Sequence, residues 1–209
     1  MNALIAGSGK KFEIQNTTKY DLVIAADGGI HILLDNKIIP DILIGDMDSI
    51  DEDLLNNLPK KIDLIRYPSE KDFTDLELAL QYAMLKGCSE IILVGITGIR
   101  IDHVLNNINM AYNYFSKGIF VKLIDDFNIM FFLKKGKYNL KVPSKYKYLS
   151  LLPWRNDSFI NKLEGVKYPL KDTLLKFGTG HGVSNECMEN DFYVEIGSGE
   201  LLVVYSFEK

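Results

Sequence analysis

The chain has 209 residues, of which 47% are hydrophobic and 25% charged, and its formal net charge is −4. This composition is ordinary for a globular protein, and the length suits one large domain or two small ones. No apolar run reaches the roughly 18 residues of a membrane span, and the acidic chain carries no long basic tract, which argues against nucleic acid as its main partner. The first residues lack the pattern of a signal peptide, so we expect a cytoplasmic protein with no membrane association.

Short runs rich in isoleucine, leucine and valine recur through the first two thirds of the chain and predict strands. Most of them are followed by glycine, aspartate or serine, a pattern typical of parallel strands that are buried on both faces. The runs cover residues 2–7, 21–27, 40–46, 63–68, 90–95 and 121–125.

Helical patterns lie between several of these strands. Apolar side chains recur at helical spacing over residues 74–86 and 102–117, and a glycine follows each segment. Thr74 and Glu77 have the spacing of a capping box, which places a helix start there. The alternation of strands and helices predicts an α/β domain with a mostly parallel sheet.

The pattern changes near Lys134. From there the chain has short strands and turns without a long helical stretch, which predicts a smaller all-β domain, a sandwich or partial barrel. We therefore expect an α/β nucleotide-binding domain over residues 1–133 and a β-sandwich domain over residues 134–209. The strand candidates of the second domain cover residues 137–142, 148–153, 159–165, 174–178, 191–199 and 200–206.

Acidic residues follow several predicted strands, at the edge where open α/β sheets bind their ligands. Asp27 and Gly28 follow one strand, and Asp46 and Asp48 follow the next. In an extended segment, residues two apart point the same way, so Asp46 and Asp48 could share one Mg²⁺ through carboxylate oxygens. The alternative is an Asp-rich turn that caps the following helix.

A second polar group surrounds the start of the first predicted helix. Asp72, Thr74 and Asp75 lie at a helix N-terminus, which attracts phosphate. The carboxylates of Asp72 and Asp75 would repel phosphate unless a metal ion lay between them. Lys71 could meet a phosphate as a point charge, or it could be an ordinary surface lysine. Thr74 could serve only as the N-cap, and Asp75 is favourable in the first turn of any helix.

The stretch from Gly95 to His103 precedes the second predicted helix. Gly95 and Gly98 would let backbone amides approach a phosphate chain, and the Arg100 guanidinium could grip phosphate oxygens. The alternatives are that Arg100 forms a surface ion pair, that Asp102 is only the N-cap of its helix, and that His103 is a partly buried structural residue.

A glycine-rich turn in the second domain ends in Ser184 and Asn185. These polar side chains could line the pocket of a heterocyclic ligand, although the same sequence is typical of a hairpin connection. The two cysteines, Cys88 and Cys187, lie far apart without metal-ligand spacing and are interpreted as free structural thiols.

Taken together, these clusters resemble the thiamine pyrophosphokinase family. The matching segments occur in the family's order, span most of the chain and form a highly specific set. They are DGG at 27–29, PDILIGDMDS at 40–49, EKDFTD at 70–75, GITGIRIDH at 95–103, KYPLKD at 167–172 and GVSNE at 182–186.

The resemblance implies an enzyme that uses ATP as co-substrate and Mg²⁺ as cofactor to convert thiamine to thiamine diphosphate, with AMP as the second product. It also implies a homodimer with the active site at the subunit interface. By resemblance, Asp46, Asp48 and Asp75 would hold the metal, and Ser184 and Asn185 would bind thiamine. Catalytic roles would fall to Asp46, Asp48, Asp72, Asp75 and Arg100. Contacts to the nucleotide would come from Asp27, Gly28, Lys71, Asp72, Thr74, Gly95, Gly98, Arg100, Asp102 and His103.

Two other functions fit part of this pattern. The same carboxylates would serve pyrophosphoryl transfer to another heterocyclic alcohol, such as a hydroxymethyl pterin, in which case the β-domain pocket would discriminate. The third possible function is a non-catalytic sensor of nucleotide or thiamine diphosphate. The loss of a metal-binding carboxylate would favour a sensor, but this chain keeps all of these carboxylates. Asp72 and Asp75 both remain candidates for the base that accepts the proton of the substrate alcohol.

Overall fold

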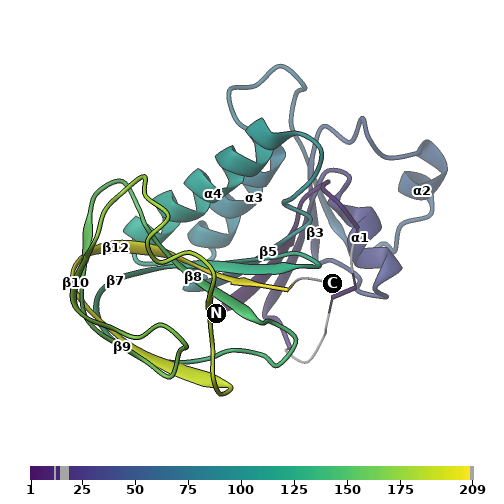
Figure 1. The fold of residues 1–209 in the computed structure, drawn as a ribbon. Helices are drawn as coiled ribbons and strands as arrows, with labels where there is room; N and C mark the ends of the chain where they lie inside the picture. Colours follow the sequence, from purple (N-terminus) through teal and green to yellow (C-terminus); the bar gives the residue numbers. More distant parts are fainter. Residues whose placement is uncertain (12, 15–18, 208–209) are drawn as a thin grey trace. The chain divides into compact units, whose positions relative to one another are not determined.

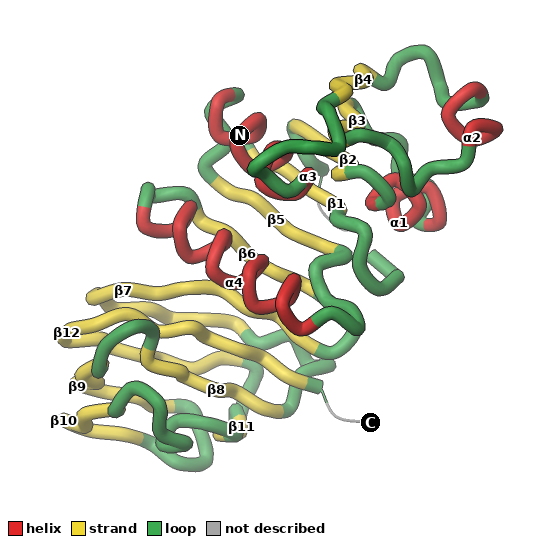
Figure 2. The backbone as a smooth tube through the Cα atoms, turned by 90° about the horizontal axis from the view of Figure 1, so that it is seen from above, coloured by secondary structure: helices red, strands yellow, loops and turns green. Residues whose placement is uncertain are grey.

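The computed structural model describes residues 1–11, 13–14 and 19–207, and the chain divides into two units, Met1–Asp126 and Phe127–Lys209. The first unit contains a six-stranded parallel sheet in the order β6-β5-β1-β2-β3-β4, whose strands are all labelled in Figure 2. Its strands are β1 (Asn2–Ala6), β2 (Leu22–Ala26), β3 (Ile42–Gly45), β4 (Asp63–Arg66), β5 (Glu90–Val94) and β6 (Phe120–Ile124).

Helices cover both faces of this sheet. Helix α1 packs on the face formed by Leu4, Ala25 and Leu43, whereas α3 and α4 lie on the opposite face (Figure 1). The helices are α1 (Gly29–Asp35), α2 (Glu52–Asn56), α3 (Asp75–Leu85) and α4 (Ile101–Ser116). Strands β1, β2, β3 and β5 are therefore buried on both sides, as the apolar runs predict. Edge strand β4 differs, because three of its four residues are exposed.

The ends of α3 and α4 follow from local sequence. The Thr74 hydroxyl accepts a hydrogen bond of 3.2 Å from the Glu77 N–H, which confirms the predicted N-cap of α3. At its other end, Gly87 adopts φ +82° and donates to the Met84 carbonyl, while the next N–H donates to Ala83. This pair of bonds is a Schellman motif, and α4 ends in the same way at Gly118.

The second unit is built from antiparallel strands, with no helix among its described residues (Figure 2). The first half of β12 pairs with β9, the second half pairs with β8, and β7 runs along its other side throughout. The register shifts between Ile196 and Glu200, where β12 passes from one pairing to the other, as strands do at the corners of sandwiches and barrels. The strands are β7 (Asn128–Lys141), β8 (Tyr148–Pro153), β9 (Ser158–Glu164), β10 (Leu170–Leu175), β11 (Asn185–Glu186) and β12 (Asp191–Ser206).

An aromatic cluster forms part of the core of this unit. Phe131 and Phe192 both meet the Tyr205 ring edge to face, with centroids 5.4 and 6.2 Å apart. Tyr205 is 3% exposed, and burial raises the pKa of its hydroxyl well above the usual value. The α/β architecture followed by a smaller all-β part is thus confirmed.

Several element boundaries differ from the sequence prediction. The expected domain boundary after residue 133 falls inside β7, and the division at Asp126 precedes this strand. The two runs predicted over 191–206 form the single strand β12. The strand predicted over 174–178 begins earlier, at Leu170, and ends at Leu175. Three of the six residues of this edge strand are exposed, and the polar residues Lys171, Asp172 and Thr173 interrupt its apolar pattern.

Candidate active site

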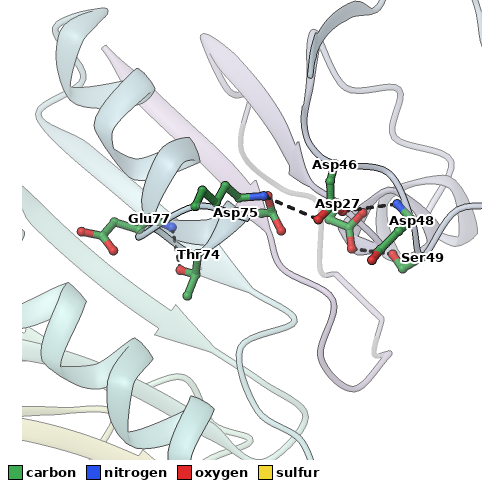
Figure 3. Close-up of polar contacts among 8 residues, drawn as sticks. Asp27, Asp46, Asp48, Ser49, Thr74, Asp75 and Glu77 are labelled. Carbon is green, nitrogen blue, oxygen red and sulfur yellow. Dashed lines mark hydrogen bonds and ion pairs between the residues drawn. The ribbon is translucent and has the colours of Figure 1, made fainter. Parts of the chain in front are cut away.

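Three carboxylates converge at the carboxyl ends of β2 and β3. One oxygen from each of Asp27, Asp46 and Asp48 lies within 4.8 Å of the other two, and Figure 3 shows the three side chains gathered together. Asp27 is 7% exposed, Asp46 is intermediate and Asp48 is exposed. A group of hard oxygen donors this close, with an open side, suits a small divalent cation.

The backbone around Asp27 is fixed in a conformation that few residues adopt. Asp27 has φ +47°, and its N–H donates to the Ile44 carbonyl on the neighbouring strand at 2.8 Å. Its Oδ2 accepts a hydrogen bond from the Ser49 hydroxyl at 2.5 Å, whereas the buried Oδ1 has no hydrogen-bond partner within the described ranges. A buried carboxylate oxygen without a partner is costly, which points to a cation as its missing neighbour.

Asp46 and Asp48 come together through a turn, so the predicted extended segment is wrong. Met47 between them adopts φ +66° and buries its side chain in the core. The Asp48 N–H donates to Asp46 Oδ1 at 3.3 Å, which closes an Asx turn. The turn places both carboxylates near Asp27, and the expected neighbourhood of Asp46 and Asp48 therefore arises by a different route.

Like charges raise the pKa of Asp48. The largest cause is the Asp46 carboxylate, followed by partial burial and by the charge of Asp27. For Asp46, burial acts to raise the pKa, but the Asp48 N–H and the Lys71 ammonium outweigh it and lower the pKa. The cluster thus carries excess negative charge, which a bound cation would neutralise.

Lys71 joins this cluster to the start of α3. Its ammonium lies 2.9 Å from Asp75 Oδ1 and 3.6 Å from Asp46 Oδ2, and its side chain is only 12% exposed. The alternative that Lys71 is an ordinary surface lysine is therefore wrong. Asp75, which the resemblance places among the metal ligands, lies outside the close group of Asp27, Asp46 and Asp48 and forms an ion pair with Lys71. Asp72, one residue further along, is exposed.

The loops that follow β1 and β5 form a second polar region on the same sheet. Strand order reverses between these two neighbours, so the carboxyl ends of β1 and β5 form the topological switch point at which open α/β sheets bind ligands. The Gly9 N–H donates to the Gly95 carbonyl at 2.7 Å, and the Lys10 N–H donates to the Thr97 carbonyl at 2.7 Å. Gly95 has φ +63° and leaves no room for a Cβ, whereas Gly98 faces open space.

Arg100 and Asp102 pair with each other at the start of α4. The Arg100 Nε donates to Asp102 Oδ1 at 3.2 Å, and both side chains are mostly exposed. This bond raises the pKa of Arg100 and lowers that of Asp102. Arg100 occupies the N-cap position and Asp102 lies in the first turn, so the alternative that Asp102 caps the helix is wrong. His103 is exposed, so the alternative of a partly buried histidine is also wrong.

The polar residues expected to bind substrate in the second unit lie side by side but differ in environment. Ser184 is exposed, has φ +57°, and donates its N–H to the Ser150 hydroxyl at 3.1 Å. Asn185 is 7% exposed, and its carboxamide is bonded to the backbone of Tyr168 at 2.8 and 3.0 Å.

Comparison with known proteins decides the family. The profile described as "Thiamin pyrophosphokinase, catalytic domain" matches residues 15–123, and "Thiamin pyrophosphokinase, vitamin B1 binding domain" matches residues 137–201. The thiamine pyrophosphokinase of Bacillus subtilis is 35% identical over 191 residues, which cover 91% of this chain and 89% of that protein. The chain belongs to the thiamine pyrophosphokinase family.

Other members of the thiamine pyrophosphokinase family extend the match. Thiamine pyrophosphokinase 1 of Arabidopsis thaliana is 29% identical over 90% of this chain and 79% of its own. The crystal structure of the Bacillus subtilis thiamine pyrophosphokinase superposes with a TM-score of 0.92 over 100% of both chains, at 30% identity. The protein is accordingly an enzyme that makes thiamine diphosphate. None of the helices in the described part of the chain combines the length and apolar character needed to cross a membrane.

Three residues that shape this thiamine pyrophosphokinase site were given no role by the sequence analysis. Ser49 holds Asp27, Gly9 locks the loop after β1 to the loop after β5, and the Asn107 side chain donates to the Ile96 carbonyl at 2.8 Å. Ser49 lies within the matching segment at 40–49, and Gly9 lies within the Gly-Ser-Gly run at 7–9, so both positions carried a sequence signal. Asn107 had none, because its role depends on where α4 meets the loop.

Proposed function

We propose that the enzyme catalyses magnesium-dependent transfer of a pyrophosphoryl group from ATP to the hydroxyl of thiamine, with thiamine diphosphate and AMP as products. The observation that carries this proposal is the carboxylate group of Asp27, Asp46 and Asp48, with its buried unpartnered oxygen. These residues fit Mg²⁺, which prefers a few carboxylate oxygens and completes its shell with water and phosphate oxygens.

The metal would be held by Asp46 and Asp48 together with Asp27, and Asp75 would support it through Lys71. When bound, Mg²⁺ supplies neutralisation of the charge on the transferring phosphates. Lys71, which forms ion pairs with both Asp46 and Asp75, adds a positive charge beside these carboxylates. The chain's own contribution is therefore to position donors and balance charge, which is what phosphoryl transfer demands.

The nucleotide would bind across the switch point between β1 and β5. Its contacts would come from backbone amides near Gly95 and Gly98, from the N-terminus of α3 at Asp72 and Thr74, and from Arg100. The Arg100 guanidinium is exposed and held by one carboxylate, so it is free to exchange Asp102 for phosphate oxygens. Asp27, Gly28, Asp102 and His103 complete the proposed nucleotide contacts.

Thiamine would bind at the second unit, beside Ser184. In the transfer step, the thiamine hydroxyl oxygen forms a bond to the β-phosphorus of ATP, and the bond between that phosphorus and the bridging oxygen of AMP breaks. The proton of the alcohol goes to a basic group or to solvent. We further propose a homodimer in which the α/β unit of one chain and the β unit of the other complete each site.

The test of the metal assignment is a comparison of single and double variants. We expect Asp46→Asn or Asp48→Asn to lower turnover by about 100-fold or more, since the metal carries much of the charge stabilisation. Asp35→Asn, an exposed carboxylate paired with Lys11 on the same unit, is the matched control and should retain activity. An active Asp46→Asn/Asp48→Asn double variant would contradict the assignment.

A further inference from the structure

The buried carboxamide of Asn185 acts as a structural partner for one exposed tyrosine. Its Oδ1 accepts the N–H of Tyr168 at 3.0 Å, and its Nδ2 donates to the carbonyl of the same residue at 2.8 Å. The Oδ1 also accepts the Glu186 N–H at 2.9 Å. A side chain that bonds both polar groups of one residue fixes that residue's backbone as a neighbouring strand would.

The reason for this arrangement lies in the path of the chain. Residues 165–168 run antiparallel to 185–188, with the Lys167 N–H donating to the Glu186 carbonyl at 2.8 Å and the Met188 N–H donating to Gly165 at 2.9 Å. Ser184 adopts φ +57°, and the backbone of Asn185 pairs with Leu149 of β8, while its side chain bonds the backbone of Tyr168. The Asn185 side chain thus bonds Tyr168 in place of a backbone peptide.

Tyr168 is further restricted by its successor. Pro169 follows it, and a residue before proline is confined to extended backbone conformations. The side chain above this rigid backbone is nonetheless 57% exposed. The Lys167 ammonium lies 5.5 Å from the ring centroid, but Glu186 neutralises it at 2.9 Å. The fold therefore uses a buried polar residue and a proline to hold an aromatic ring in contact with solvent.

We infer that Tyr168 is the aromatic surface for the planar cationic heterocycle of the substrate, and that Asn185 is a positioning residue that acts through it. This inference rests on the proposed function, in which thiamine binds beside Ser184. Thiamine carries two flat rings, one with a permanent positive charge, and an aromatic face attracts both flat and cationic groups. A ring carried on a backbone that is fixed in advance binds such a group without the loss of loop freedom that ordering the backbone would cost.

The first test is steady-state kinetics of variants at the ring. We expect Tyr168→Ala to raise the KM for thiamine by roughly 2- to 30-fold, the range of a cation–π contact, and to leave the KM for ATP unchanged. Tyr168→Phe should restore most of that affinity because it keeps the ring. Phe177→Ala is the matched control, since Phe177 is 56% exposed in the same unit and its side chain has no assigned role.

The second test is a double-variant cycle that asks whether Asn185 acts through Tyr168. Asn185→Ala should raise the KM for thiamine, and adding Tyr168→Ala should cause little further loss, because both changes remove the same contact. If the increases in KM of the two single variants multiply in the double variant, Asn185 contacts thiamine itself, and its positioning role is overturned. Thermal melts of each variant separate a folding defect from a binding defect.

The outcomes distinguish this inference from the function on which it depends. If the wild-type enzyme forms thiamine diphosphate but Tyr168→Ala keeps the wild-type KM for thiamine, the inference fails alone. If the wild-type enzyme does not convert thiamine with ATP, the proposed function fails first. A rise in KM with Tyr168→Ala that Tyr168→Phe does not reverse would also contradict the aromatic contact.

Discussion

Replacing the buried carboxylate Asp27 with asparagine should uncouple the stability of the protein from magnesium. Asparagine keeps the size of the side chain, and its carbonyl oxygen can still accept the Ser49 hydroxyl hydrogen bond. What changes is one negative charge beside Asp46. At 4.8 Å, two carboxylates repel by about 1 kcal/mol in water and by about 3 kcal/mol at an effective dielectric constant near 20.

Relief of this repulsion should stabilise the metal-free protein. One kcal/mol corresponds to about 2 to 4 °C in Tm for a protein of this size, so a rise of a few degrees is expected. The same change removes a metal ligand, and millimolar Mg²⁺ should then raise the Tm of Asp27→Asn by much less than it raises that of the wild type.

Thermal melts with and without Mg²⁺ measure both effects. Asp35→Asn serves as control, because its carboxylate pairs with Lys11 at the surface and should respond to Mg²⁺ as the wild type does. An Asp27→Asn variant that melts at or below the wild-type temperature without metal, and that keeps the full magnesium-dependent rise in Tm, would contradict both effects.

Three further predictions concern the nucleotide loops and the assembly. Arg100→Lys should lower kcat/KM by roughly 10- to 1000-fold, because lysine lacks the planar guanidinium that donates paired hydrogen bonds to phosphate oxygens. Wild-type kinetics in this variant would show that Arg100 only forms a surface ion pair. Gly9→Ala should lower the free energy of unfolding by about 1 to 3 kcal/mol in a denaturant melt, because the added Cβ would lie 2.4 Å from two carbonyl oxygens. Gly98→Ala is the control and should leave stability unchanged, because the space around Gly98 is open. Asp48→Asn chains mixed with Ser184→Ala/Asn185→Ala chains, assayed at thiamine below the wild-type KM, should regain part of the activity if each site is shared between subunits. Confirmed subunit exchange without recovery would contradict a shared site.

Much of the fold follows from the sequence because its signals are local. The apolar runs of the parallel strands, the Thr74 cap and the glycines after α3 and α4 each act within a few residues of the chain. The long strand β12 was divided in two because the glycines near its bend, including Gly199 with φ +82°, look like a turn. Pairing with β7 on one side keeps the strand continuous through that bend.

The site was less predictable, because its decisive contacts join distant segments. The sequence places Asp27 and Asp46 after successive strands at one edge of the sheet, but the close approach of their carboxylates depends on the pairing of β2 with β3. The turn at Met47 likewise requires a left-handed residue that sequence patterns do not mark. The sequence marks Asn185 as a polar residue in a glycine-rich segment and, by resemblance, as a thiamine-binding residue, but its bonds to Tyr168 depend on how two chain segments meet.

The most direct test of the central claim is the fate of each phosphorus atom of ATP in one turnover. The enzyme would be incubated with thiamine, Mg²⁺ and ATP labelled separately at the α, β and γ positions. We predict that the β and γ labels appear together in thiamine diphosphate while the α label leaves as AMP, in equal amounts. Formation of ADP with thiamine monophosphate carrying only the γ label would contradict pyrophosphoryl transfer.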